Sequence, residues 1–155
     1  AFESGRCDVF SNDVSALSAY RLKLVNPAEY VILPELISKE PLGPVVRQGD
    51  ETWTSIVRWA LYSMIVAEEL GVTSANADGL KTSGSPEVQR LLGGNGNFGE
   101  SMGLKPDWAQ QIVKQVGNYG EVYERNVGTG SKLGIGRGLN KLWTQGGLQY
   151  APPVR

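Results

Sequence analysis

A proline-interrupted segment divides this chain into two parts with different expected structures. Residues 34–49 contain Pro34, Pro41 and Pro44, and a proline inside a central β-strand removes a hydrogen-bond donor from the ladder. The apolar residues between these prolines therefore predict an edge strand or a pair of crossing strands. Such a segment suits a connection between two domains.

The part before this segment has the pattern of an α/β sheet. Cys7–Phe10 is a candidate strand, and a second short strand is expected over residues 30–33. Asp13 stands at the N-cap position of a helix expected over residues 14–24. Strand, helix and strand in this order form a βαβ-like fragment.

The part after the segment is predicted to be helical. Asp50 is a suitable N-cap, and Gly71 is suited to end the helix that Asp50 begins. Apolar residues in this helix recur at the spacing of a buried stripe. They are Trp53, Ile56, Val57, Ala60, Leu61 and Met64. A further helix is predicted to begin at Ser85-Pro86, with the proline at the first helical position.

Pro106 is predicted to open one long helix. A glycine-rich loop is expected over residues 128–136, followed by a short helix over residues 139–143 and an extended end over residues 150–155. The expected apolar face of the long helix is formed by Trp108, Ile112, Val116, Tyr119 and Tyr123. All four tryptophans of the chain lie in apolar stripes, which favours packing in a core.

The composition excludes several classes of function. The hydrophobic fraction is 41%, the charged fraction is 20% and the net charge is -1, so the chain is an ordinary globular protein with no basic run for nucleic acid. Histidine is absent, which removes the commonest general base and the commonest zinc ligand. Cys7 is the only cysteine, so no disulfide can form within the chain. We therefore predict no catalytic residue, no metal site and no cofactor, and a protein that is not an enzyme.

The apolar segments are too short to cross a membrane. The most apolar stretch, residues 56–66, contains Arg58 and is shorter than the ~20 residues that span a bilayer. Gly5 is typical of a helix C-terminus, and from its position near the start we expect further chain upstream.

Two groups of residues could bind anions, but each has a simpler interpretation. The glycine cluster over residues 128–134 lacks the Gly-Lys-Ser/Thr ending of a phosphate-binding loop and follows no predicted strand, so a loop between helices is favoured. Four arginines are also candidates for anion binding, although solvation or a structural ion pair is favoured for them. These are Arg47, Arg58, Arg125 and Arg137.

Asp13 is a sharper candidate for ligand binding. It follows a predicted strand and precedes a helix, and ligands of open α/β sheets bind outside the carboxyl ends of the strands. A carboxylate at that place can accept charge-assisted hydrogen bonds from an ammonium group. The alternative is that Asp13 only caps the helix, and the local sequence leaves both interpretations open.

Four segments resemble one family of proteins. Residues 5–17, Gly-Arg-Cys-Asp-Val-Phe-Ser-Asn-Asp-Val-Ser-Ala-Leu, are similar to a segment of the type II periplasmic solute-binding proteins. The similarity is greatest to the general L-amino-acid-binding group of polar amino-acid ABC transporters. Residues 37–50 resemble the place where the chain of that family recrosses between its lobes, and residues 117–128 and 138–155 resemble the C-terminal extension of the group.

The resemblance implies an α/β fold that is part of a two-lobed periplasmic-binding-protein fold of type II, with a helical C-terminal extension. Residues 1–34 would be the C-terminal part of the second lobe, and residues 35–49 the hinge crossing and returning strand. Residues 50–155 would be helices of the first lobe and the extension. The chain would thus be a C-terminal fragment that lacks most of the first lobe.

The same resemblance implies the ligand contacts and the partners. Asp13 aligns with the aspartate that holds the α-amino group of the ligand, and Ser11 lies beside it. Cys7 would have a disulfide partner on a neighbouring strand, which this chain lacks. The implied partners are an L-amino acid, the membrane permease of the ABC transporter in the periplasm, and the missing N-terminal part or a second copy. Three alternatives remain: an enzyme on the same scaffold, a sensory domain and a helical interaction module.

Overall fold

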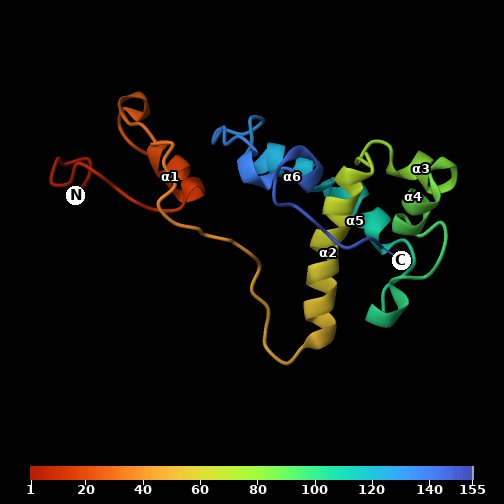
Figure 1. The fold of residues 1–155 in the computed structure, drawn as a ribbon. Coiled ribbons are helices and arrows are strands. Elements are labelled where there is room, and N and C mark those ends of the chain that lie inside the picture. Colours follow the sequence, from red (N-terminus) through yellow and green to blue (C-terminus); the bar gives the residue numbers. More distant parts are fainter. Residues whose placement is uncertain (155) are drawn as a thin grey trace.

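The computed structural model describes residues 1–154, which form two parts joined by an extended segment (Figure 1). Within these residues, α1 and η1 lie in the first part, and the other helices lie in the second. The α-helices are α1 (Val14–Arg21), α2 (Glu51–Glu69), α3 (Ala77–Ser83), α4 (Pro86–Leu91), α5 (Trp108–Val116) and α6 (Tyr119–Asn126). Short 3-10 helices are η1 (Pro27–Glu29), η2 (Glu100–Met102), η3 (Gly138–Asn140) and η4 (Trp143–Gln145). No helix among these residues is long and apolar enough to cross a membrane.

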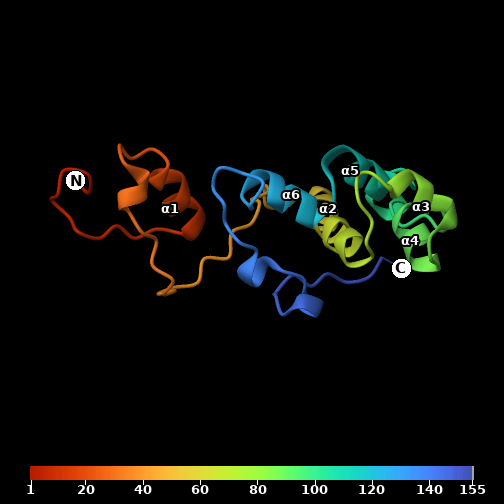
Figure 2. The same ribbon diagram turned by 90° about the horizontal axis from the view of Figure 1, so that it is seen from above.

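The second part is built around α2. Helix α2 packs against α5 and α6, and α3 packs against α4 and α5, so that the helices form one cluster at one end of the molecule (Figure 2). The extended end of the chain returns to this cluster, where Ala151 and Val154 are buried. The predicted extended end is therefore confirmed up to residue 154, and Arg155 lies outside the described residues.

The ends of the helices follow the predicted caps. The Asp50 carboxylate accepts a hydrogen bond of 2.9 Å from the Trp53 N–H at the start of α2. After α2 the chain turns at Gly71, whose φ is +69°, a conformation that glycine adopts without steric cost. Ser85 caps α4, and Pro86 is its first residue. These three predictions are confirmed.

The long helix predicted from Pro106 is wrong, because two helices meet at Gly117. Gly117 has φ +95° and ψ 174°, which no α-helix can contain. Asn118 then caps α6: its side chain accepts from the Glu121 N–H at 2.9 Å, and the Glu121 carboxylate accepts from the Asn118 N–H at 2.8 Å. This capping box fixes a new helix start, and the final predicted helix is likewise replaced by the two 3-10 turns η3 and η4.

The stripe predicted to be buried on α2 is only partly covered. The buried residues of α2 are Ser63, Ile65, Val66 and Ala67. Trp53, in the predicted stripe, is 51% exposed, and Leu61 is 37% exposed. Ile56 of the stripe packs against the core, so the periodicity identified an apolar face of α2 but not how much of it is covered. Trp143 is also exposed, and only Trp108 is buried among the four tryptophans.

The two strands predicted in the first part do not form. Residues 7–10 and 30–33 are without strand pairing, and no strand occurs among residues 1–154, because an extended segment becomes a strand only when a neighbour pairs with its N–H and C=O groups. Four aromatic rings hold this part together, with Phe2 5.3 Å from Tyr30 and Phe10 5.6 Å from Tyr20 between centroids. Gly5 ends a turn in which the Arg6 N–H bonds to the Ala1 carbonyl at 3.0 Å, as at a helix C-terminus.

The connecting segment is held neither by hydrogen bonds nor by burial of its large apolar side chains. Residues 31–49 make no hydrogen bond within the part of the chain that the structure describes, and Ile37, Leu42 and Val45 are 84%, 73% and 97% exposed. It runs between the two parts as an extended segment without secondary structure (Figure 1). The sequence predicted an edge strand or a pair of crossing strands here. The segment is extended, as predicted, but no neighbouring strand pairs with it within residues 1–154.

Candidate ligand-binding site

Asp13 lies where the sequence predicted it, at the N-terminus of α1. Its Oδ1 accepts a hydrogen bond of 2.9 Å from the Ala16 N–H and a second one from the Ser15 hydroxyl. Its Oδ2 accepts none from residues 1–154. The side chain is therefore a helix cap that keeps one carboxylate oxygen for another donor.

The surroundings of Asp13 keep it negatively charged. The hydrogen bond from the Ser15 hydroxyl, and then the one from the Ala16 N–H, hold the pKa of the Asp13 carboxyl below its ordinary value. Hydrogen bonds to the charged form stabilise that form, and the positive end of the α1 dipole acts in the same direction. At neutral pH the group can receive an ammonium ion without first losing a proton.

Ser11 stands just before this cap and is exposed. Asn12, between the two residues, accepts the Asp13 N–H on its side-chain oxygen at 2.9 Å, which fixes the turn into α1. Ser11 and Asp13 are thus near each other in sequence at one helix end, and no residue of the second part is hydrogen-bonded to either of them within residues 1–154.

One cavity lies between the two parts of the molecule. It has a volume of about 250 Å³ and is lined by one face of α1, by Ile32 and by the loop over residues 132–135. The residues of this face are Val14, Ser18 and Arg21, with Leu22 at the C-cap of the helix. Sequence reasoning missed this contact, for which the apolar Leu133 and Ile135 inside the glycine-rich loop are the signal that could have indicated it.

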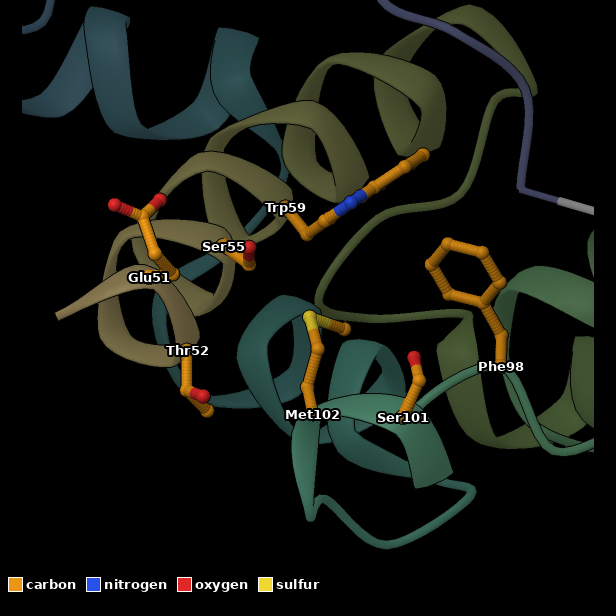
Figure 3. A pocket seen from close by; sticks show the side chains of 7 residues that line it. All are labelled: Glu51, Thr52, Ser55, Trp59, Phe98, Ser101 and Met102. Atoms are coloured by element: carbon orange, nitrogen blue, oxygen red, sulfur yellow. The ribbon is translucent and has the colours of Figure 1, made fainter.

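A second cavity, of about 240 Å³, opens at the start of α2 (Figure 3). The side chains of Thr52 and Ser55 line it from α2, with Ser101 and Met102 on the facing turn. Aromatic rings close the other end, where Trp59 and Phe98 meet edge to face with centroids 4.6 Å apart. Neither Asp13 nor Ser11 lines either cavity.

The remaining candidate residues have structural roles or lie in solvent. Arg137 forms an ion pair with Glu68 at 3.0 Å, and Arg125 donates to the Val116 carbonyl at 2.8 Å. Arg47 and Arg58 are exposed. The glycine cluster is a loop, as favoured from the sequence. Within residues 1–154, no group of side chains could hold a metal ion.

Cys7 is a free, exposed cysteine. The disulfide implied by the family resemblance is therefore not formed in this chain, which has no second cysteine to supply it.

Comparison with known proteins gives consistent results over the whole chain. No family model matches it. It is 56% identical over 157 residues to the general L-amino acid-binding periplasmic protein AapJ of Rhizobium johnstonii, and 52% identical over 155 residues to the glutamate/glutamine/aspartate/asparagine-binding protein BztA of Rhodobacter capsulatus. These alignments cover 100% and 99% of this chain but 46% of each relative, so the chain spans about half the length of the curated relatives it matches.

A solved structure decides the relationship. A periplasmic binding protein of an ABC transporter from Brucella ovis, solved with glutathione bound, matches with a TM-score of 0.95 and 52% identity over 100% of this chain and 49% of its own. The chain is homologous to the periplasmic amino-acid-binding proteins of ABC transporters. Its two parts thus form a portion of the two-lobed fold of these proteins, as the resemblance implied, although no strand occurs within residues 1–154.

Proposed function

We propose that this chain is part of a periplasmic protein that binds an L-amino acid between two lobes and delivers it to the membrane permease of an ABC transporter. The observation that carries the proposal is the identity of more than half of the residues with amino-acid-binding relatives over the whole chain. The names of AapJ and BztA describe binding of amino acids, and no reaction is required for this role. The ligand is bound and released unchanged.

Asp13 is the proposed partner of the ligand's α-ammonium group, with Ser11 beside it. The free Oδ2 of the Asp13 carboxylate can accept from an ammonium ion while Oδ1 remains bonded to the Ser15 hydroxyl and the Ala16 N–H. A charged donor on a charged acceptor gives a short, strong hydrogen bond. Since Asp13 is already held by α1, little rearrangement is needed when the ligand arrives.

The exposed face of α2 supports a first lobe that is incomplete in this chain. Trp53, Val57, Leu61 and Met64 lie along one side of the helix, none of them is buried, and Trp53 is half exposed. Such a contiguous apolar face on a structured helix requires a partner. This chain covers 46% of the length of AapJ, so that relative has additional polypeptide of about the same length as this chain. We propose that such additional polypeptide, or a second copy of this chain, covers the face.

The proposed division into lobes follows the two parts of the structure. Residues 1–34 would belong to the second lobe, residues 35–49 would be the hinge crossing, and residues 50–155 would belong to the first lobe and its extension. The bare, unpaired segment over residues 31–49 supports a hinge, because no hydrogen bond within residues 1–154 restrains its backbone. A ligand that contacts both lobes favours the closed arrangement over the open one.

Binding of amino acids to the two-lobed protein that contains this chain tests the proposal. Isothermal titration with a panel of L-amino acids is expected to show binding for the unaltered protein, and Asp13→Asn is expected to weaken it by about 100-fold or more, because a buried ammonium loses its counter-charge. Asparagine is as good an N-cap as aspartate, so this variant keeps α1 and removes only the charge.

The control is Asp8→Asn, which removes an exposed carboxylate in the same segment and is expected to leave the affinity unchanged. Unchanged affinity in Asp13→Asn would rule out the assigned contact. Absence of binding to every amino acid in the unaltered protein would overturn the proposed function itself.

A further inference from the structure

The glycine-rich loop of the second part lies beside α1 of the first part. Figures 1 and 2 show this loop, residues 128–136, next to α1 from two directions, although the two segments are far apart in the sequence. Val14, Ser18 and Leu22 form the facing side of α1, and the loop presents Leu133 and Ile135 across the cavity of about 250 Å³. The loop and α1 therefore face each other through apolar side chains.

The loop is firmly attached to the second part. The Ile135 N–H donates to the Val127 carbonyl at 2.9 Å, and the Tyr123 hydroxyl donates to the Gly136 carbonyl at 3.1 Å. One residue further on, Arg137 is paired with Glu68 of α2 at 3.0 Å. With both ends fixed to α6 and α2, the loop moves as one body with the second part.

By contrast, nothing polar joins the loop to α1. No hydrogen bond or ion pair connects residues 1–34 with residues 50–154 in the described part of the chain. Yet Ser18, on the face of α1 that meets the cavity, is 8% exposed and is the one buried residue among residues 1–49. This contact is the second connection between the two parts, beside the extended segment over residues 31–49.

The contact has the character of one that forms and breaks. Protein cores are close-packed, with few voids larger than a water molecule, whereas about 250 Å³ remains open here. Apolar contact across such a gap is weak, since dispersion attraction decreases steeply with separation. Because no polar group is left without its partner on separation, opening has a low cost.

We propose that the loop over residues 128–136 is a closure strap, which docks on the Val14–Ser18–Leu22 face of α1 when the lobes close on the ligand. The inference rests on the proposed function. Asp13 caps the start of α1, so a ligand that draws Asp13 towards the first lobe brings the same helix against Leu133 and Ile135. The relative solved with glutathione has the same arrangement of both parts, with a TM-score of 0.95 over the whole chain.

Linking two cysteines across the cavity tests the strap directly. In the two-lobed protein with Cys7→Ser, the exposed residues Arg21 and Lys132 are both replaced by cysteine and treated with a short bismaleimide. The control pair joins position 21 to Lys105→Cys, an exposed position between η2 and α5 that does not line this cavity. We expect the first pair to be linked and the control pair not, and an amino acid to raise the rate of linking by about threefold or more through its shift of the population towards closure.

A second measurement removes the apolar side chains of the strap. Leu133→Ser with Ile135→Ser is expected to weaken amino-acid binding by about five- to tenfold, mainly through faster dissociation, because the closed state loses a contact that the open state lacks. The control, Leu148→Ser, changes a leucine that is 71% exposed and is expected to bind normally. Circular dichroism before titration shows that each variant is folded.

The outcomes separate the strap from the function on which it rests. A protein that binds amino acids, but whose linking at positions 21 and 132 does not respond to the ligand, would overturn the strap alone. Equal affinity of the double serine variant and its control would do the same. A protein that binds no amino acid at all would instead overturn the proposed function.

Discussion

The two parts of this molecule differ most in how they bury their side chains. Every buried apolar residue lies between residues 65 and 154, in the second part, whereas residues 1–49 bury only Ser18. Both parts are rich in apolar residues, with Val25 and Val31 of the first part 87% and 78% exposed. The difference is therefore one of available partners, since the first part has few elements to pack on.

This difference in burial indicates which part has enough internal contacts to fold by itself. Helix α1 has 8 residues, and isolated helices shorter than ~12–15 residues are marginal in water. The 19-residue α2 has α5 and α6 beside it. We infer that the second part has a cooperative core of its own, while the first part has no such core within residues 1–49.

The largest expected effect comes from a change in that core. Leu92 is 0% exposed, and Leu92→Ala is expected to reduce the free energy of unfolding by about 3 kcal/mol through lost burial and a residual cavity. The matched change Leu36→Ala, in the connecting segment at 79% exposure, is expected to cost below about 0.5 kcal/mol. Urea unfolding followed by circular dichroism measures both, and equal losses would contradict the contrast between the two parts.

A somewhat smaller effect is expected where the strap is anchored. The Arg137 guanidinium lies 5.2 Å from the ring centroids of Tyr119 and of Tyr123 and pairs with Glu68, and both charged side chains are about 15% exposed. Arg137→Met is expected to cost about 2 kcal/mol, because Glu68 is left unpaired in a partly desolvated site.

The exposed ion pair between Lys114 and Asp78 is the control for this change. It has a similar distance of 2.9 Å, but its side chains are 40% and 66% exposed. Lys114→Met is expected to leave the urea midpoint unchanged, because solvent screens such pairs. If Lys114→Met reduced the free energy of unfolding as much as Arg137→Met, burial of the Arg137–Glu68 pair would not explain its contribution to stability.

The sequence predicted where helices begin and end better than it predicted which elements pack together. Asp50, Gly71 and Ser85 were read correctly because a cap or a glycine turn depends on a few neighbouring residues. The break at Gly117 was missed, although Asn118 followed by Glu121 carries a readable capping-box pattern. The apolar periodicity continued across that break and concealed it.

Pairing between segments that are distant in the sequence could not be predicted from a few neighbouring residues. Residues 7–10 have the composition of a strand, but a strand also needs a neighbour, and no strand is paired with them within residues 1–154. For the site, Asp13 was predicted from its place before α1, whereas the strap was not. Leu133 in a glycine-rich loop gives no local sign of the helix that it faces.

Two helix caps allow the two parts to be compared residue for residue. Asn118 caps α6 and also donates to the Val72 carbonyl at 2.8 Å, and it is 6% exposed. Asn118→Ala is expected to reduce the free energy of unfolding by about 1–2 kcal/mol, through the lost cap and an unpaired buried carbonyl. Asp13→Ala removes a cap of the same kind from α1 in the part without a core.

We expect Asp13→Ala to leave the urea midpoint unchanged and to speed amide exchange only within α1. Because that helix opens locally rather than with the global transition, its cap does not contribute to the cooperative core. Urea unfolding combined with hydrogen exchange distinguishes the two variants. A lowered midpoint in Asp13→Ala would show that the first part unfolds together with the second.

The smallest expected effect is a dependence on pH that distinguishes the same two parts. Burial raises the pKa of the Glu121 carboxyl, but the hydrogen bonds from Ser74 and from the Asn118 N–H outweigh it, so the pKa lies below its ordinary value. A carboxyl with a lowered pKa stabilises the fold at higher pH, and this contribution is lost as the pH falls from about 4.5 through the folded-state pKa.

Glu121→Gln keeps a side chain suited to the capping box but removes this titration. Its urea midpoint is therefore expected to fall less steeply as the pH decreases below about 4.5. The control Glu35→Gln changes an exposed carboxylate in the connecting segment and is expected to follow the unaltered protein. Asp13 also has a lowered pKa, yet Asp13→Asn is expected to leave the acid slope of the core unchanged, because α1 does not share the core's transition. A flattened slope in Asp13→Asn instead would mean that the two parts unfold as one unit, and the distinction drawn from their burial would have to be abandoned.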